Sequence, residues 1–230
     1  MQSIRQTIVG WLALAILIGL SLSAQATKMK LGEVIAFTPF GPKPPADSNA
    51  YVFQADRGNR KGDYLLTWTG SSKDKRPGDV PGSTAQPSEY QLLSPEKVGP
   101  LPNVDVLGIH YIKVRPDRRY AFERYVSDTL HPAVGNLRPD LRLLYYKAVR
   151  GPDTGNYITI FALTKESRDK YWPGGSDSND LRAAFEPVKA HTKELLTYLV
   201  DGSALTDGKF AAAVYESREW ADFVLVPPAH

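Results

Sequence analysis

Hydrophobic and polar positions divide the second half of the chain into strands and helices. Runs rich in β-branched and aromatic residues predict four strands, at residues 106–114, 141–149, 156–163 and 219–226. Hydrophobic residues at helical spacing predict helices at residues 117–134, 165–172 and 178–200. Pro187 is expected to kink or divide the last helix, because its ring blocks a backbone hydrogen bond to the previous turn. The order strand–helix–strand–strand–helix–strand is that of a ferredoxin-like unit.

Part of this pattern occurs a second time, earlier in the chain. Residues 31–39 resemble 107–116, and residues 90–95 resemble 223–228, which predicts four strands in each copy. Between them lies a hairpin whose glycines can take positive φ without steric cost. In this hairpin, five residues are identical at a spacing of 93 positions: Ala55 and Ala148, Arg57 and Arg150, Gly58 and Gly151, Gly62 and Gly155, and Tyr64 and Tyr157. The alternative is a pair of unrelated hairpins that share their turn chemistry.

The first copy is expected to lack most of its helices. Ten of the 18 prolines lie in residues 39–102, where the segments between strands are Pro-rich or polar. A sheet without helices leaves an apolar face uncovered, so we expect the two sheets to pack face to face. The sequence thus predicts an α+β fold in which two tandem ferredoxin-like units, residues 27–102 and 103–230, form one α/β barrel within the chain.

Residues 1–26 are typical of an export signal. Arg5 precedes an uncharged run at residues 8–24, and an Ala-Gln-Ala cleavage pattern ends at Ala26. The run is short for a permanent transmembrane helix, which needs about 20 apolar residues. We therefore expect a signal peptide and a periplasmic or secreted protein, with a retained N-terminal anchor as the alternative.

Composition narrows the classes of function. The chain has 28 Lys and Arg against 25 Asp and Glu, which gives no reason to expect nucleic-acid binding. It has no Cys, which excludes disulfides and thiolate metal sites. Neither a metal-binding spacing of His, Asp and Glu nor a Gly-x-Ser-x-Gly motif occurs. We expect no metal, no nucleic-acid partner and, once the signal is cleaved, no membrane partner.

Two histidines and a group of aromatic residues are candidates for a site. His110 lies on a predicted strand and would serve as a base if it points inward; the alternative is a structural role. His131 precedes Pro132, where helices tend to end, so its alternative role is to complement the helix dipole. Aromatic side chains of the second copy can hold a flat ligand between sheet and helices, with core packing as the alternative. The ligand-binding candidates are Tyr111, Tyr125, Tyr146, Tyr171 and Trp172.

Several short motifs of the second copy resemble a known family. The motifs are Phe122 followed by His131-Pro132 and Pro139, then Lys147-Ala-Val-Arg-Gly151, Arg168-Asp-Lys-Tyr-Trp-Pro173 and Trp220-Ala-Asp-Phe-Val-Leu-Val226. They resemble the EthD-like branch of the dimeric α/β-barrel superfamily, which includes antibiotic-biosynthesis-type (ABM-like) monooxygenases. The last three motifs are still more similar to small, uncharacterised members of that superfamily. The resemblance covers residues 103–226 well and residues 31–95 in part.

The resemblance implies a pocket histidine at His131. Some relatives hold haem, but nothing else in the sequence selects for haem, so no cofactor is expected. Relatives usually build the barrel from two chains. Here the first copy takes the partner's place, which implies a monomeric pseudo-dimer, with a homodimer as the alternative.

Three functions are consistent with these features. We favour an exported protein that binds a small apolar or aromatic molecule, because the sequence places no two titratable groups under opposed pKa pressures. The alternative is a cofactor-independent oxygenase or isomerase of a small aromatic or apolar metabolite, with His131 or His110 as base and a Tyr as polariser. A third is a module that pairs with other subunits through its sheet edges.

Overall fold

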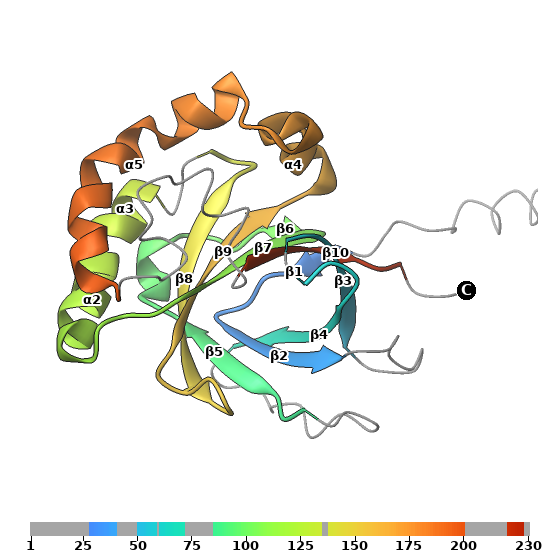
Figure 1. Cartoon of the computed structure of the whole chain (residues 1–230), viewed down its shortest axis with the longest axis horizontal. Coiled ribbons are helices and arrows are strands. Elements are labelled where there is room, and N and C mark those ends of the chain that lie inside the picture. The colour runs from blue at the N-terminus through green and yellow to red at the C-terminus, as the bar shows by residue number, and fades with distance from the viewer. Residues whose placement is uncertain are drawn as a thin grey trace, which may run out of the picture.

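Eight strands form one closed barrel, and the helices lie against one side of it (Figure 1). The structure, a computed structural model, describes residues 28–40, 50–58, 60–71, 85–134, 138–200 and 220–227. The barrel strands are β2 (Val34–Phe40), β3 (Tyr51–Gly58), β4 (Tyr64–Gly70), β5 (Ser88–Leu92), β7 (Val106–Ile112), β8 (Arg142–Arg150), β9 (Tyr157–Leu163) and β10 (Trp220–Leu225). The predicted signal at residues 1–26 lies outside the described residues.

The helices all come from the second half of the described chain. They are α2 (Arg119–Tyr125), a π-helical turn (Val126–Leu130), α3 (His131–Val134), α4 (Lys165–Tyr171) and α5 (Asn179–Tyr198), with single 3-10 turns between elements. A short ribbon pairs β1 (Met29–Lys30) with β6 (Asn103–Val104). Across these described segments, none of the helices combines the length and apolarity needed to cross a bilayer.

The α+β class and the closed barrel within a single chain are confirmed. Around the barrel the strands run β10-β3-β4-β2-β5-β8-β9-β7, and β7 pairs with β10 to close the ring. We predicted that the two sheets pack face to face; they also join edge to edge, through β3–β10 and β5–β8. The joined edges satisfy backbone N–H and C=O groups that an open sheet would leave unpaired.

The hydrogen-bond registers of the two halves match. Tyr64 pairs with Phe40 and Tyr157 with Ile112, so β2 and β7 correspond at a spacing of 72 residues. The predicted alignment of residues 31–39 with 107–116 is therefore wrong by four positions. It relied on a shared Leu-Gly pair, but in the first half that pair precedes the strand.

Glycine is required where the two halves meet. Gly58 and Gly151 have φ values of 86° and 89°, as the hairpin pattern predicted. A Cβ on Gly58 would lie 2.5 Å from the carbonyl oxygen of Trp220, and one on Gly151 would lie 2.2 Å from that of Pro87. Each glycine thus lets a hairpin strand approach the last strand of the other half closely.

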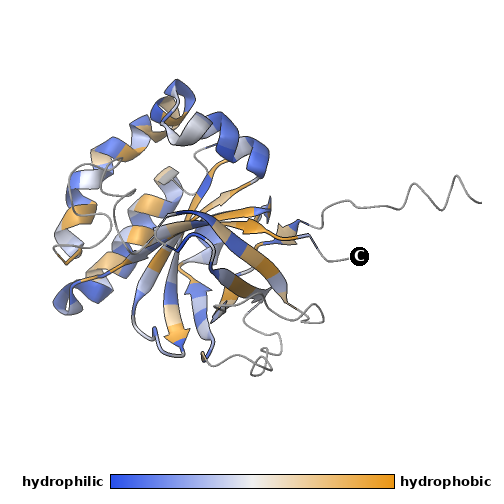
Figure 2. Ribbon diagram, turned by 45° about the vertical axis from the view of Figure 1, so that its right-hand side comes forward, coloured by the Kyte–Doolittle hydropathy of each residue, from blue (hydrophilic) through white to orange (hydrophobic). Residues whose placement is uncertain are grey.

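Two hydrophobic cores follow from strand alternation, which Figure 2 shows as alternating colours along the strands. Ile158 and Ile160 of β9 point into the barrel, where a packed core fills the interior. Tyr157 and Phe161 point outward into a second core beneath the helices. The first core joins both halves, and the second belongs to the helix-covered half alone.

Helix α5 begins at a capped end and continues through its proline. The Ser178 side chain accepts a hydrogen bond from the Leu181 N–H at 3.1 Å, which caps the helix. Pro187 does not divide α5, which runs unbroken to Tyr198 and arcs over the sheet (Figure 1). Of the two predicted effects of Pro187, a kink or a division, the division is absent, and Val188 and Leu195, beyond the proline, stay packed in the core. Residues 41–49 and 72–84, which belong to the segments of the first half that we predict to lack helices, lie outside the described residues.

Candidate functional site

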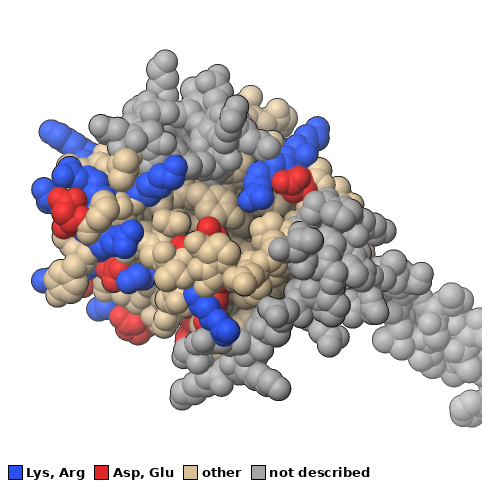
Figure 3. Space-filling model, turned by 60° about the horizontal axis from the view of Figure 1, so that its bottom comes forward, with Lys and Arg blue, Asp and Glu red and all other residues tan. Residues whose placement is uncertain are grey.

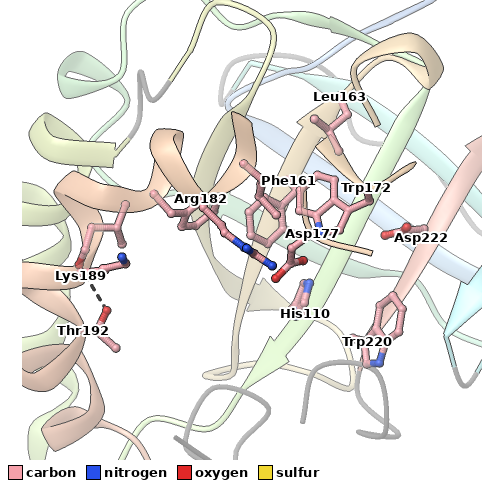
Figure 4. A pocket seen from close by; sticks show the side chains of 13 residues that line it. His110, Phe161, Leu163, Trp172, Asp177, Arg182, Lys189, Thr192, Trp220 and Asp222 are labelled. Carbon is pink, nitrogen blue, oxygen red and sulfur yellow. Dashed lines mark hydrogen bonds between the residues drawn. The ribbon is translucent and has the colours of Figure 1, made fainter. Parts of the chain in front are cut away.

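A cavity of about 380 Å³ lies between α5 and the outer face of β7, β9 and β10 (Figure 4). It is partly open, and most of its wall is apolar or aromatic. The sheet side contributes five side chains and α5 contributes six, so one helix face and one sheet face enclose it. The lining residues are His110, Phe161, Leu163, Trp172, Asp177, Leu181, Arg182, Phe185, Val188, Lys189, Thr192, Trp220 and Asp222.

His110 forms the base of the cavity. Its neighbours Ile109 and Tyr111 belong to the barrel interior, so alternation turns the imidazole outward. The ring lies between Phe161, 5.4 Å away between centroids, and Trp220, which stacks on it at 6.0 Å. His110 is 4% exposed, and its Nδ1 has no hydrogen-bond partner among the residues that the structure describes. Burial lowers its pKa from 6.5 to about 4, so the ring is neutral at pH 7.

Asp222 is the carboxylate of the same wall. It sits opposite Gly108 in the register, and a Cβ at Gly108 would lie 3.1 Å from the Asp222 Oδ1. The absence of a side chain at Gly108 therefore leaves room for the carboxyl group. Burial raises the pKa of Asp222 from 3.8 to about 6, while Arg168 and Arg57 act in the opposite direction.

The arginines near Asp222 are engaged by other carboxylates. Arg168 of α4 donates from one nitrogen to both carboxylate oxygens of Asp56, at 2.9 and 2.7 Å. Arg57 lies 3.9 Å from Asp169. Arg168 is largely buried, so its pair with Asp56 links a helix of the second half to β3 of the first. The Asp222 carboxylate itself makes no hydrogen bond or ion pair with the residues that the structure describes.

The helix side of the cavity is apolar in the middle and charged at its margin. Leu181, Phe185 and Val188 recur at helical spacing and face the sheet. Arg182 and Lys189 are exposed at the margin. Lys189 pairs with Glu186 at 2.5 Å, and both side chains of that pair are solvated. The polar groups in the cavity's interior are thus those of the sheet.

His131, the other predicted candidate, lies outside this cavity. It is fully buried in the second core, where its Nε2 accepts a hydrogen bond from the Tyr145 backbone N–H at 3.2 Å. Burial lowers its pKa to about 4, with a smaller opposite effect from the Leu93 backbone. The structure therefore places the two candidate histidines in different environments, one in a cavity and one in a packed core.

The aromatic candidates are dispersed. Tyr146 fills the barrel interior and donates to the Gly32 carbonyl at 2.9 Å, and Tyr111 packs beside that interior core. In the second core, Tyr125 donates to the His191 carbonyl at 2.9 Å and Tyr171 donates to Asp140 at 2.7 Å. Of the five candidates, Trp172 is the one that lines the cavity.

Several lining residues were not singled out from the sequence. Trp220 and Asp222 alternate on the outward face of the last strand, and Phe185 lies one turn after Leu181 on α5. Period-two and helical spacing could have placed these side chains on the correct faces. The spacing could not show that the faces leave a gap, because a gap depends on how far α5 stands from the sheet.

Charge is mixed over the described surface. On the face in Figure 3, Lys and Arg lie interspersed with Asp and Glu among the described residues. Among those same residues, no group of three or more His, Asp or Glu gathers in a way that could hold a metal ion. The cavity is thus the feature of the described structure best suited to a ligand.

No protein-family model matches the sequence, and no curated protein is significantly similar to it. Among solved structures, an anthrone oxidase-like protein aligns with 84% of this chain and 91% of its own, at 12% identity and a TM-score of 0.44. A major regulator of staphylococcal pathogenesis aligns with 84% of this chain and 98% of its own, at 11% identity and a TM-score of 0.39. At these TM-scores the similarities carry no functional information about this chain.

Proposed function

We propose that this protein binds a small, largely apolar or aromatic molecule in the cavity between α5 and the sheet. The observation that carries the proposal is the buried His110, which lies in an aromatic cavity of about 380 Å³ and whose Nδ1 has no partner within the described part of the chain. Ligand sites commonly measure about 300–1,000 Å³ and combine an apolar wall with few polar groups. An unpartnered buried nitrogen costs on the order of 1–3 kcal/mol, which a ligand hydrogen bond would recover. Binding of this kind needs no cofactor.

A thermal-shift screen with a library of small aromatic and aliphatic metabolites tests the proposal. We expect at least one compound to raise the melting temperature of the protein. Its apparent affinity should fall at least tenfold in His110→Phe and in Trp172→Ala. His191→Gln is the matched control, since His191 lies on α5, the helix that covers the cavity, but is not one of the lining residues. A ligand whose affinity is unchanged in both cavity variants would overturn the proposal.

A second candidate function is acid–base catalysis on the bound molecule. The observation that favours it is the opposed shift of two groups in one wall, with the pKa of His110 lowered to about 4 and that of Asp222 raised to about 6. His110 and Asp222 lie on the adjacent strands β7 and β10. His110 pairs with Trp220, two residues before Asp222, so both side chains face the same ligand. A catalyst of this kind would convert the screening hits, and its rate would fall below pH 6 in the wild type but not in Asp222→Asn. If mass spectrometry shows that the screening hits are recovered unchanged, catalysis is excluded and binding remains as the function.

We further propose that the two halves are tandem ferredoxin-like copies of the EthD-like or ABM-like branch, with the first half in the partner's place. The support is that both halves have the internal order last, first, third, second strand, and that their registers match. A protein built in this way is a monomer in sedimentation. A dimer that dissociates only on unfolding would contradict it.

We propose export as the setting of this function, with residues 1–26 removed as a signal peptide. The support is the pattern of Arg5, the uncharged run at residues 8–24 and the Ala26 cleavage pattern. N-terminal sequencing of protein from the periplasm or medium is expected to start at Thr27. A mature protein that retains Met1 would favour the anchor instead.

A further inference from the structure

We infer that the ligand of this cavity carries a positively charged amine, which Asp222 binds while the aromatic wall holds the apolar part. The inference rests on the proposed binding function and names the chemical class of its ligand. Three features of the described residues support it: the unsatisfied carboxylate of Asp222, the local balance of charge and the aromatic faces beside that carboxylate.

Asp222 is the charged group of the cavity that water and protein satisfy least. It is only partly exposed, and its carboxylate makes no hydrogen bond or ion pair with the described residues. A carboxylate removed from water is costly unless a donor or a cation compensates it. Arg182 and Lys189 differ, because they are exposed at the margin and remain hydrated. The group in the cavity that lacks a compensating partner is therefore negatively charged.

Among the described residues, the cluster of charged side chains that includes Asp222 carries one net negative charge. Two cations, Arg57 and Arg168, face three carboxylates, those of Asp56, Asp169 and Asp222. At the margin, Lys189 pairs with Glu186, and Arg182 and Asp177 contribute one charge of each sign. A ligand with one positive charge would neutralise this end of the cavity, whereas an anionic ligand would double its negative charge.

Aromatic faces beside Asp222 add a second attraction for a cation. Trp172, Trp220 and Phe161 line the same wall, and Figure 4 shows Asp222 next to Trp172 and Trp220. The negative face of an indole ring attracts an ammonium group, and the attraction grows when water is excluded. His110 is neutral at pH 7 and so does not repel the cation. A hydroxyl ligand could satisfy the hydrogen bond of Asp222 but not its charge.

Three probes with the same ring test this inference: 2-phenylethylamine, 2-phenylethanol and 3-phenylpropionate. Calorimetric titration at pH 7.5 is expected to show the amine binding at least tenfold more tightly than the alcohol, with the propionate weakest. In Asp222→Asn the amine should lose that advantage while the alcohol binds as before. Asp177→Asn is the matched control, since it removes one carboxylate from the same cavity lining and leaves Asp222 in place. Cooperative thermal unfolding of each variant shows that it is folded.

The pH dependence gives an independent readout. The affinity of the amine should be constant above pH 7 and fall several-fold by pH 5, because Asp222 protonates and a neutral carboxyl does not attract the ammonium group. His110 stays neutral over this interval. The other charged groups that face Asp222 are Asp56, Arg57, Arg168 and Asp169.

The possible results separate this inference from the proposed function. If the alcohol or the propionate binds as tightly as the amine, and His110→Phe weakens that binding, the cavity binds ligands but the amine inference is wrong. An amine that shows no binding at millimolar concentration, or keeps its advantage in Asp222→Asn, also overturns the inference. If in addition no library compound depends on His110 or Trp172, the proposed function fails as well.

Discussion

The outer faces of the two barrel halves share a backbone plan but differ in chemistry. The matched registers place Thr38 of β2 where His110 lies in β7, and Glu89 of β5 where Asp222 lies in β10. Each acidic residue also pairs in register with an arginine across a strand irregularity, Arg150 in one case and Arg57 in the other. The common plan therefore supplies an acidic position on both faces.

The faces differ in what surrounds that position. In the second half, Gly108 leaves room beside Asp222, and α5 encloses an aromatic cavity above it. In the first half Ala36 occupies the position of Gly108, and the depression beside Glu89 measures about 200 Å³. Glu89, unlike Asp222, has an interaction partner. The comparison indicates that the helix cover and a few side chains, rather than the barrel itself, make the site.

The largest expected effect concerns the junctions between the halves. Gly151→Ala should lower the free energy of unfolding by more than about 3 kcal/mol, because its Cβ would meet the Pro87 carbonyl and its φ is 89°. Gly62→Ala should cost only about 1 kcal/mol, since Gly62 has a similar φ but open space around it. Urea unfolding of both variants measures the difference. Equal losses would show that the close junction contributes nothing.

The next effect is an acid dependence that belongs to the helix-covered half. His110 has a pKa of about 4 when folded and about 6.5 when unfolded, so the unfolded state binds the extra proton first. Its contribution to stability is complete above pH 6.5 and is lost as the pH falls to 4, on the order of 3 kcal/mol. His110→Phe should therefore lose less stability than the wild type between pH 7 and 4. The same slope in His191→Gln and His110→Phe would contradict this.

A smaller effect is expected where α4 crosses to the first half. Arg168→Met should lower the free energy of unfolding by about 2 kcal/mol, because it leaves Asp56 without its paired hydrogen bonds. The double variant Arg168→Met with Asp56→Leu should recover part of that loss, since neither partner then remains unpaired. Double-mutant unfolding measurements give the coupling. Additive losses would mean that the pair does not hold the two halves together.

The smallest effect distinguishes the two acidic positions directly. Asp222→Asn should raise stability at pH 7 by about 1 kcal/mol, because it removes the cost of a charge with a raised pKa. The sign follows because the pKa of Asp222 is 3.8 when unfolded and about 6 when folded: the unfolded state loses its proton first, so stability falls as the pH rises from about 4 to 6, and the cost is complete above pH 6. Glu89→Gln should not stabilise the protein, because Glu89 has a partner. A stabilisation of equal size at both positions would remove the distinction between the faces.

The sequence was informative about strands, turns and order because these depend on local periodicity. The predicted strand at residues 156–163 differs from β9 by one residue at its start, and Gly58 and Gly151 have the predicted positive φ. It was less informative about alignment between the copies, where a shared Leu-Gly pair outside the first strand misplaced β2 by four positions.

The cavity could be predicted only in part, because it depends on packing distances. Alternation on β7 indicates which face His110 takes but not whether a cavity or a core lies there. His131 illustrates the converse: its place before Pro132 is compatible with a pocket, yet the residue is fully buried beside Tyr145. The spacing of residues in the sequence indicates which way a side chain points, whereas the presence of a cavity depends on the distance between elements in the folded structure.

The most direct test of the account follows the histidine ring nitrogens by NMR in protein labelled with ¹⁵N-histidine, during titration with the strongest ligand from the screen. We expect the Nδ1 resonance of His110 to shift as the ligand binds, while those of His131 and His191 stay in place. A ligand that binds without moving the His110 resonances, or that moves those of His131 instead, would contradict a site in the cavity beneath α5.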